Sequence, residues 1–203
     1  MVMSDIQIIN FGLDSQFRNT ERLLKSLVNA FSDSQQEAKG RRLDVCFTRT
    51  FRKNQFAQRL RERTFVTHVM AHGTPDGSLH GLYGLLNSQL SAEQTLRQPA
   101  AKLGMDVLVL DACQTFSKAW RAQVREALPR GRSLTLIGTT RDVGWNEATM
   151  YMATFYGTLL SHPVPRGRDA RIEMVTVAHR RAKKLMNATF VGGCSFALVE
   201  IKK

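Results

Sequence analysis

Two apolar stretches of the sequence stop at residues that can carry chemistry. FVTHVMA (residues 65–71) is followed at once by His72-Gly73, and VLVL (residues 107–110) is followed by Asp111-Ala112-Cys113. Short apolar runs of this kind are typical of buried strands. In a parallel sheet the carboxyl ends of neighbouring strands face one crevice. We therefore expect His72 and Cys113 to lie together at one edge of a sheet.

Apolar strand patterns alternate with helical patterns along the rest of the chain. Strands are expected at residues 6–12, 43–51, 65–71, 107–110, 133–139 and 195–201. Helices are expected at residues 20–31, 53–63, 91–103, 116–128, 146–161 and 169–187. Asn19 or Thr20 would cap the first helix and Ser91 the third, and the turn signal at residues 75–77 predicts a small hairpin within residues 73–84. The alternation predicts an α/β fold, a three-layer sandwich of about six mostly parallel strands with helices on both faces.

Length and composition limit the classes of protein that the chain can represent. It has 203 residues, of which 43% are hydrophobic, and this suits one domain over residues 1–203. We expect neither a membrane span nor a secretion signal, because no apolar run reaches about 18 residues and residues 1–5 lack the signal pattern. Cys46, Cys113 and Cys194 are too widely spaced for a disulfide framework or a zinc motif. The sequence thus predicts a soluble, cytoplasmic protein.

The formal charge of +12 is concentrated in two windows of the sequence. Residues 41–63 hold eight basic residues against Asp44 and Glu62, and residues 166–184 hold seven against two acidic residues. Such windows can attract nucleic acid, an acidic membrane or an acidic protein, and they can equally be solvated helix faces. No known nucleic-acid-binding motif accompanies them. A nucleic-acid partner is therefore open but not favoured.

Cys113 and His72 are the residue types that nucleophilic catalysis needs. A free thiol is mostly protonated at neutral pH, so a nucleophilic cysteine needs an imidazole or a helix amino terminus to favour the thiolate. The helix expected from Phe116 would follow Cys113 closely, and His72 could accept and donate the proton. We assign Cys113 as the candidate nucleophile and His72 as the candidate acid/base. For Cys46 and Cys194 we expect burial in the core.

The histidines also raise the question of a metal site. His68 and His72 are four residues apart and would share one face of a strand, and His80 and the candidate nucleophile could complete a ligand set. Zinc sites usually show tight paired spacings, which this set lacks. We therefore expect no metal and no other cofactor. His162 is interpreted as a loop residue and His179 as a solvated helix residue.

The order of motifs along the chain resembles that of the caspase-like cysteine peptidases. The motifs are His72-Gly73, DACQT (residues 111–115), GTT (residues 138–140), TFYGTL (residues 154–159) and VAHRRA (residues 177–182). Over residues 65–185 this order is similar to the CHAT branch, whose members are bacterial and eukaryotic relatives of caspases and separase. The resemblance implies a caspase-like fold and a cysteine endopeptidase that cleaves a protein substrate, as CHAT enzymes do in bacterial (including antiviral) defence and regulated cell death.

The resemblance also implies roles for further residues. The backbone N–H groups of Gly73 and Cys113 would form the oxyanion hole. In metacaspases an acidic residue two positions before the cysteine helps to bind a basic side chain just before the cleaved bond, and Asp111 occupies that position here. The alternative is that Asp111 caps the following helix. Asp142 and Trp145 are candidates to line the same groove.

Two other classes stay open at this point. A caspase-like fold without activity could serve as an interaction module, although the intact His72 and Cys113 pair counts against it. The basic windows leave a nucleic-acid-binding protein as the third class. CHAT domains often follow helical repeats that regulate them, and this chain has no room for such repeats, so regulation would come from an activating partner, an effector or self-processing.

Overall fold

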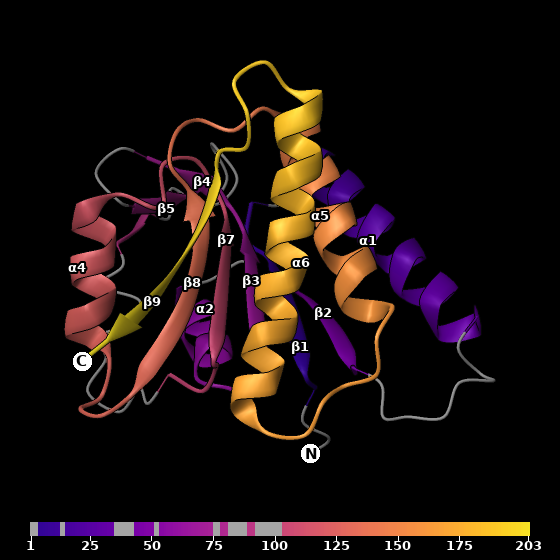
Figure 1. Cartoon of the computed structure of the whole chain (residues 1–203). Coiled ribbons are helices and arrows are strands. Elements are labelled where there is room, and N and C mark those ends of the chain that lie inside the picture. Colours follow the sequence, from indigo (N-terminus) through magenta and orange to yellow (C-terminus); the bar gives the residue numbers. More distant parts are fainter. Residues whose placement is uncertain are drawn as a thin grey trace.

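The computed structural model describes residues 4–12, 15–34, 43–50, 53–74, 78–80, 89–91 and 103–203. They form a six-stranded sheet with helices on both faces (Figure 1) and a smaller three-stranded sheet. The strands of the large sheet are β1 (Ile6–Asn10), β2 (Val45–Arg49), β3 (Val66–Met70), β7 (Val107–Asp111), β8 (Ser133–Thr139) and β9 (Phe196–Lys202). The small sheet contains β4 (His72–Gly73), β5 (Ser78–His80) and β6 (Gln89–Ser91). The helices are α1 (Ser15–Ser34), α2 (Lys53–Leu60), α4 (Lys118–Ala127), α5 (Trp145–Leu160) and α6 (Arg168–Thr189).

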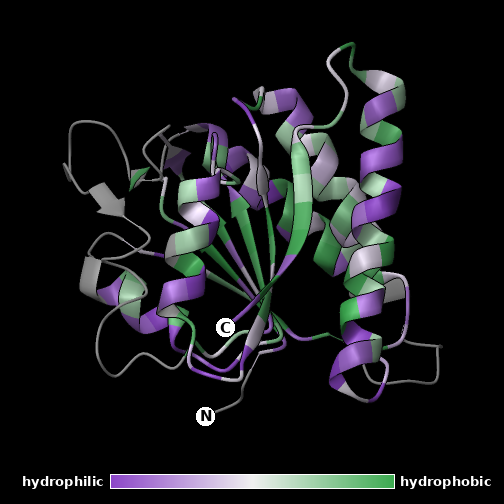
Figure 2. Cartoon of the chain, turned by 60° about the vertical axis from the view of Figure 1, so that its left-hand side comes forward, coloured by the Kyte–Doolittle hydropathy of each residue, from purple (hydrophilic) through white to green (hydrophobic). Residues whose placement is uncertain are grey.

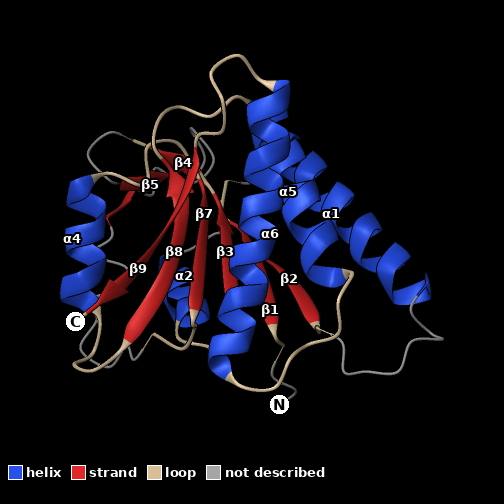
Figure 3. Cartoon of the chain, viewed as in Figure 1, coloured by secondary structure: helices blue, strands red, loops and turns tan. Residues whose placement is uncertain are grey.

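The strand order of the large sheet is β2-β1-β3-β7-β8-β9. The first five strands are parallel, and β9 runs antiparallel to β8 at the edge (Figure 3). This arrangement is α/β and agrees with a caspase-like three-layer sandwich, which confirms the fold class predicted from the alternating pattern. The predicted hairpin is also present, because β4 pairs antiparallel with β5.

The central strands are apolar on both sides because each side is covered by helices. All five residues of β1, of β3 and of β7 are buried. One core cluster joins the sheet to α1, α5 and α6, and the other joins it to α2 and α4. Figure 2 shows the hydrophobic strands lying between helices whose outer surfaces are largely hydrophilic. None of the helices in the described ranges combines the length and apolar character needed to cross a membrane.

Helix α1 begins at Ser15, so the predicted cap at Asn19 or Thr20 is wrong. Thr20 is buried inside the helix, and its hydroxyl lies 3.3 Å from the Thr149 hydroxyl of α5. The extra first turn buries Phe17 in the core. The cap prediction failed because Thr20 contacts another helix instead of its own amino terminus. Ser91 ends β6, and most of the helix predicted over residues 91–103 lies outside the described residues.

His179 is buried, which corrects the interpretation of this residue as solvated. Its Nδ1 atom lies 2.6 Å from the Tyr151 hydroxyl, across the contact between α6 and α5. Burial lowers the pKa of His179 to about 4, and the charges of Lys183 and Arg180 act in the same direction. His179 therefore belongs to the packing of the two helices.

Candidate active site

The two apolar stretches that carry His72 and Cys113 are neighbouring parallel strands. In the pairing of β3 with β7, Met70 lies opposite Asp111, and the Ala71 N–H donates to the Asp111 carbonyl over 3.1 Å. Both strands therefore end level at the same edge of the sheet. This confirms the expectation that the strand ends meet.

Gly73 lies directly against the backbone of Cys113. A Cβ atom built on Gly73 would overlap the carbonyl oxygen of Cys113 and come within 2.8 Å of its nitrogen. Only glycine can occupy this position without displacing the Cys113 backbone. The amide groups predicted for the oxyanion hole thus belong to two backbone segments in contact.

A tight turn holds Cys113 at the end of β7. The next residue, Gln114, has a left-handed backbone conformation with a φ of 56°. The Ala112 carbonyl accepts hydrogen bonds from the hydroxyls of Thr115 (3.0 Å) and Thr139 (2.5 Å). The sequence indicated no role for these two threonines, although both stand in the DACQT and GTT motifs. They connect the turn to β8 and thereby hold Cys113 in place.

Helix α4 begins farther from Cys113 than expected. Its first residue is Lys118, and its cap is Ser117, whose hydroxyl accepts a hydrogen bond of 3.1 Å from the Trp120 N–H. Asp111 is therefore not the cap of this helix, and the capping alternative is excluded. The separation also weakens the expected influence of the helix dipole on the thiol, because that influence falls off within one turn.

A cavity of about 90 Å³ opens beside the thiol. It is lined by Gln16, Phe17, Ala71, His72, Asp111, Ala112, Cys113, Val143, Trp145 and Ala148. The structure thus brings together four residues that the sequence had singled out, His72, Asp111, Cys113 and Trp145. Phe17, which sequence reasoning missed, contacts His72 edge-on at 5.1 Å between ring centroids and Trp145 at 5.7 Å.

Asp142 lies next to Cys113 and outside the cavity wall described above. Its role in a substrate groove therefore stays a prediction. Its Oδ1 atom accepts a hydrogen bond of 2.9 Å from Gln114 Nε2, and its carboxylate accepts another from the Cys113 thiol. Trp145 is the first residue of α5, one residue before the helix expected over residues 146–161.

The thiol of Cys113 is not activated in this arrangement. Burial raises its pKa, and the nearby carboxylates of Asp142 and Asp111 raise it further, while a hydrogen bond from the Val143 N–H acts in the opposite direction. From the sequence, conditions that favour the thiolate were expected. The groups around Cys113 instead favour the protonated thiol.

Asp111 is a buried carboxylate that no cation pairs with among the described residues. Its exposed fraction is 2%, and its Oδ2 atom has no hydrogen-bond partner among the described residues. Burial raises the pKa of Asp111 to about 7. Unpaired buried acids of this kind are costly to fold and are enriched at functional sites.

His68 and His72 do not share a strand face, which corrects the geometric basis of the metal alternative. His72 belongs to β4, whereas His68 lies within β3 and stacks on Tyr156 with ring centroids 5.6 Å apart. Burial lowers the pKa of His68 to about 3. Among the described residues, no group of three or more His, Cys, Asp or Glu side chains could hold a metal ion. Cys46 and Cys194, expected in the core, are only half-buried.

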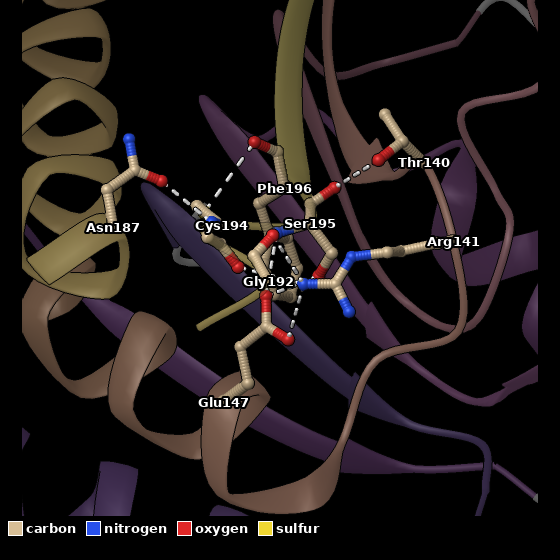
Figure 4. Close-up of polar contacts among 9 residues, drawn as sticks. Thr140, Arg141, Glu147, Asn187, Gly192, Cys194, Ser195 and Phe196 are labelled. Atoms are coloured by element: carbon tan, nitrogen blue, oxygen red, sulfur yellow. Dashed lines mark hydrogen bonds and ion pairs between the residues drawn. The ribbon is translucent and has the colours of Figure 1, made fainter. Parts of the chain in front are cut away.

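A polar network holds the loop that carries Asp142 and Val143 (Figure 4). Glu147 Oε1 accepts hydrogen bonds from the Ser195 N–H (2.7 Å) and hydroxyl (2.6 Å). Arg141 Nη2 lies 3.4 Å from Glu147 Oε2 and donates to the carbonyls of Gly193 (2.8 Å) and Gly192 (3.3 Å). We call Arg141, Glu147 and Ser195 the loop latch. It ties the loop after β8 to the segment before β9.

Comparisons of the sequence with protein-family models and with curated proteins found no match. Inference about function therefore starts from the geometry of this edge of the sheet.

Proposed function

We propose that the protein is a cysteine endopeptidase with Cys113 as nucleophile and His72 as general acid/base, and that it cleaves a protein substrate after a basic residue. The observation that carries the proposal is the meeting of His72, Cys113 and the unpaired Asp111 carboxylate in one cavity at the level ends of β3 and β7. The proposal also includes a role in bacterial defence or regulated cell death, which the resemblance to CHAT peptidases implies.

The chemistry assigns one role to each group. The Cys113 sulfur attacks the substrate carbonyl carbon while His72 takes the thiol proton, which the raised thiol pKa makes necessary. Backbone N–H groups of Gly73 and Cys113 stabilise the oxyanion. The C–N bond then breaks, His72 gives its proton to the leaving amine, and water hydrolyses the thioester.

Asp111 supports the preference for a basic residue. An arginine or lysine side chain in the cavity would give the buried carboxylate its missing partner through a charge-assisted hydrogen bond. A neutral or acidic side chain would leave that carboxylate unpaired. Because Asp111 has a pKa of about 7, the preference should strengthen as the pH rises through that value and the group ionises.

The proposal also covers partners and location. The raised pKa of the thiol and its contact with Asp142 describe a resting site, so we include an activating partner or effector. The three cysteines are free thiols, as in the reducing cytoplasm, and we propose that location.

A panel of fluorogenic peptides that differ only in the residue before the cleaved bond tests the proposal. We expect hydrolysis after Arg and Lys, abolished in Cys113→Ala and reduced by about 10²- to 10⁴-fold in His72→Ala. Asp111→Asn should lose the preference for Arg over Leu and its pH dependence. Cys46→Ala, which changes a thiol outside the cavity, is the matched control.

The outcomes separate the parts of the proposal. Cleavage after Leu or Asp that depends on Cys113 would keep the peptidase and remove Asp111 from substrate recognition. A folded protein that hydrolyses no peptide, alone or with cell extract added as a source of activator, would contradict the peptidase and favour an interaction module.

A further inference from the structure

A second and larger cavity lies at the opposite edge of the large sheet. Its volume is about 480 Å³, within the range of small-molecule sites. Asp5, Phe65 and Asp106 line it, and they directly precede β1, β3 and β7. The cavity therefore lies at the amino ends of the strands whose carboxyl ends carry the candidate active site. In Figure 1 the first turn of α6 reaches this same end of the sheet.

The two basic windows of the sequence meet at this cavity. Arg63 comes from the first window, and Arg171 comes from the second. Arg132 adds a third guanidinium group to the lining, and Arg168 pairs with the lining residue Asp106 over 3.0 Å. Arg63 of the first window and Arg168 and Arg171 of the second thus lie around one concave site.

Positive charge is in excess around this cavity. Asp106 also faces Arg132 at 3.7 Å, and Asp5 faces Arg171 at 3.9 Å, and both distances exceed a hydrogen bond. The lining residues thus carry three guanidinium groups against two carboxylates, and the neighbouring Arg168 also faces Asp169 at 3.9 Å. Arg63 is exposed and forms no ion pair or hydrogen bond with the rest of the described chain.

The arginines are held in place by the protein itself. Arg132 donates to the Leu103 carbonyl over 3.1 Å, and Arg171 donates to the Pro165 carbonyl over 3.3 Å. Arg171 also lies over the Phe65 ring, 5.8 Å from its centroid. Guanidinium groups that are already oriented lose less freedom when a ligand binds.

We propose that this cavity binds phosphate, either free or as part of a small phosphate ester. Positive charge is in excess among the lining residues, and the tetrahedral oxygens of phosphate can accept hydrogen bonds from guanidinium groups on several sides. The site is independent of Cys113 and His72, so it does not rest on the peptidase.

Binding of inorganic phosphate and of adenosine 5′-monophosphate, measured by calorimetry and thermal unfolding at constant ionic strength, tests this site. We expect saturable heat and a rise in Tm with at least one probe. Arg63→Gln should weaken the binding by about tenfold or more, because it removes a charged hydrogen-bond donor without breaking an ion pair within the described chain. Arg130→Gln changes an exposed arginine outside the cavity lining and should bind as the wild type does.

The two probes distinguish the sources of the phosphate. Tighter binding of the nucleotide would assign an ester, and equal or weaker binding would assign the free anion. The absence of saturable binding for both probes would overturn the proposal. So would equal affinities in Arg63→Gln and the wild type, since the phosphate would then bind elsewhere.

Discussion

The two edges of the large sheet treat their acidic residues in opposite ways. At the amino ends of the strands, Asp5 and Asp106 each face arginines. At the carboxyl ends, Asp111 is buried with one oxygen unpartnered among the described residues, and its pKa is about 7. One edge thus has cations in excess, and the other has a carboxylate that lacks one.

The difference indicates which charge a ligand must carry to bind favourably at each end of the sheet. An unpaired buried carboxylate lowers the stability of the folded state and is relieved only by protonation or by a cation. An excess of oriented arginines is relieved by an anion. Each edge is therefore complementary to a ligand of the opposite charge. Substitutions that remove the charge difference between the two edges should change stability and binding in predictable directions.

The largest effect is expected for Gly73→Ala. Gly73 lies where the carboxyl ends of β3 and β7 meet. The new Cβ would overlap the Cys113 backbone, so the free energy of unfolding should fall by about 1–3 kcal/mol or more, and hydrolysis should be lost. Denaturant unfolding and peptide hydrolysis measure both.

Gly157→Ala is the matched control for this substitution. A Cβ at Gly157 meets no atom within 4 Å, and alanine is favoured over glycine within a helix by about 0.5–1 kcal/mol. We expect a small gain in stability with activity retained. Equal behaviour of the two variants would contradict the close approach of Gly73 to Cys113.

A smaller effect of opposite sign is expected for Asp111→Asn. The folded-state pKa of about 7 lies above the ordinary value of 3.8, so the folded protein holds this proton more tightly than the unfolded chain. The stability due to Asp111 is present below about pH 4 and is lost as the pH rises to about 7. Asp111→Asn should therefore raise Tm at pH 8.

Thermal unfolding at several pH values checks this sign. The gain in Tm from Asp111→Asn should shrink as the pH is lowered from 8 to 5, since the wild-type carboxyl becomes neutral as well. Asp169→Asn, which changes a fully exposed carboxylate, is the control and should leave Tm nearly unchanged. A loss of stability in Asp111→Asn at pH 8 would show that the carboxylate is paired.

The smallest of the three effects concerns the loop latch. Glu147→Gln weakens the buried hydrogen bonds to Ser195 and the ion pair with Arg141, at a cost of about 0.5–1.5 kcal/mol, since the glutamine amide oxygen can still accept from Ser195. Release of the loop should also change the rate at which iodoacetamide alkylates Cys113. The rate should rise, because the loop holds Asp142 against the thiol.

Glu173→Gln is the control for the latch. Glu173 pairs with Arg180 on an exposed surface, and the substitution should change stability by less than about 0.5 kcal/mol. An unchanged alkylation rate in Glu147→Gln would show that the loop latch does not affect the reactivity of the Cys113 thiol.

The sequence predicted the parts of the fold and site that depend on local pattern. The apolar runs before His72 and Asp111 located two neighbouring strands, because strands covered on both faces have an unmistakable composition. The distinctive motif residues His72, Asp111 and Cys113 then fell into one cavity. These inferences needed no knowledge of distant contacts.

The rest depends on contacts between residues far apart in sequence. Glu147 and Ser195 are 48 residues apart, and neither belongs to a local pattern. Phe17 reaches the cavity through a first helical turn that no capping signal indicated. The pKa of the Cys113 thiol moved against expectation because burial and Asp142 outweigh the Val143 N–H, and burial cannot be judged from the order of residues.

Labelling with an arginine-directed acyloxymethyl ketone, mapped by mass spectrometry, tests the central claim most directly. For the wild type we predict one adduct, on Cys113, absent in Cys113→Ala and slower by about 10²-fold or more in His72→Ala. Adducts spread equally over Cys46, Cys113 and Cys194, or a rate unchanged in His72→Ala, would contradict a nucleophile built from the ends of β3 and β7.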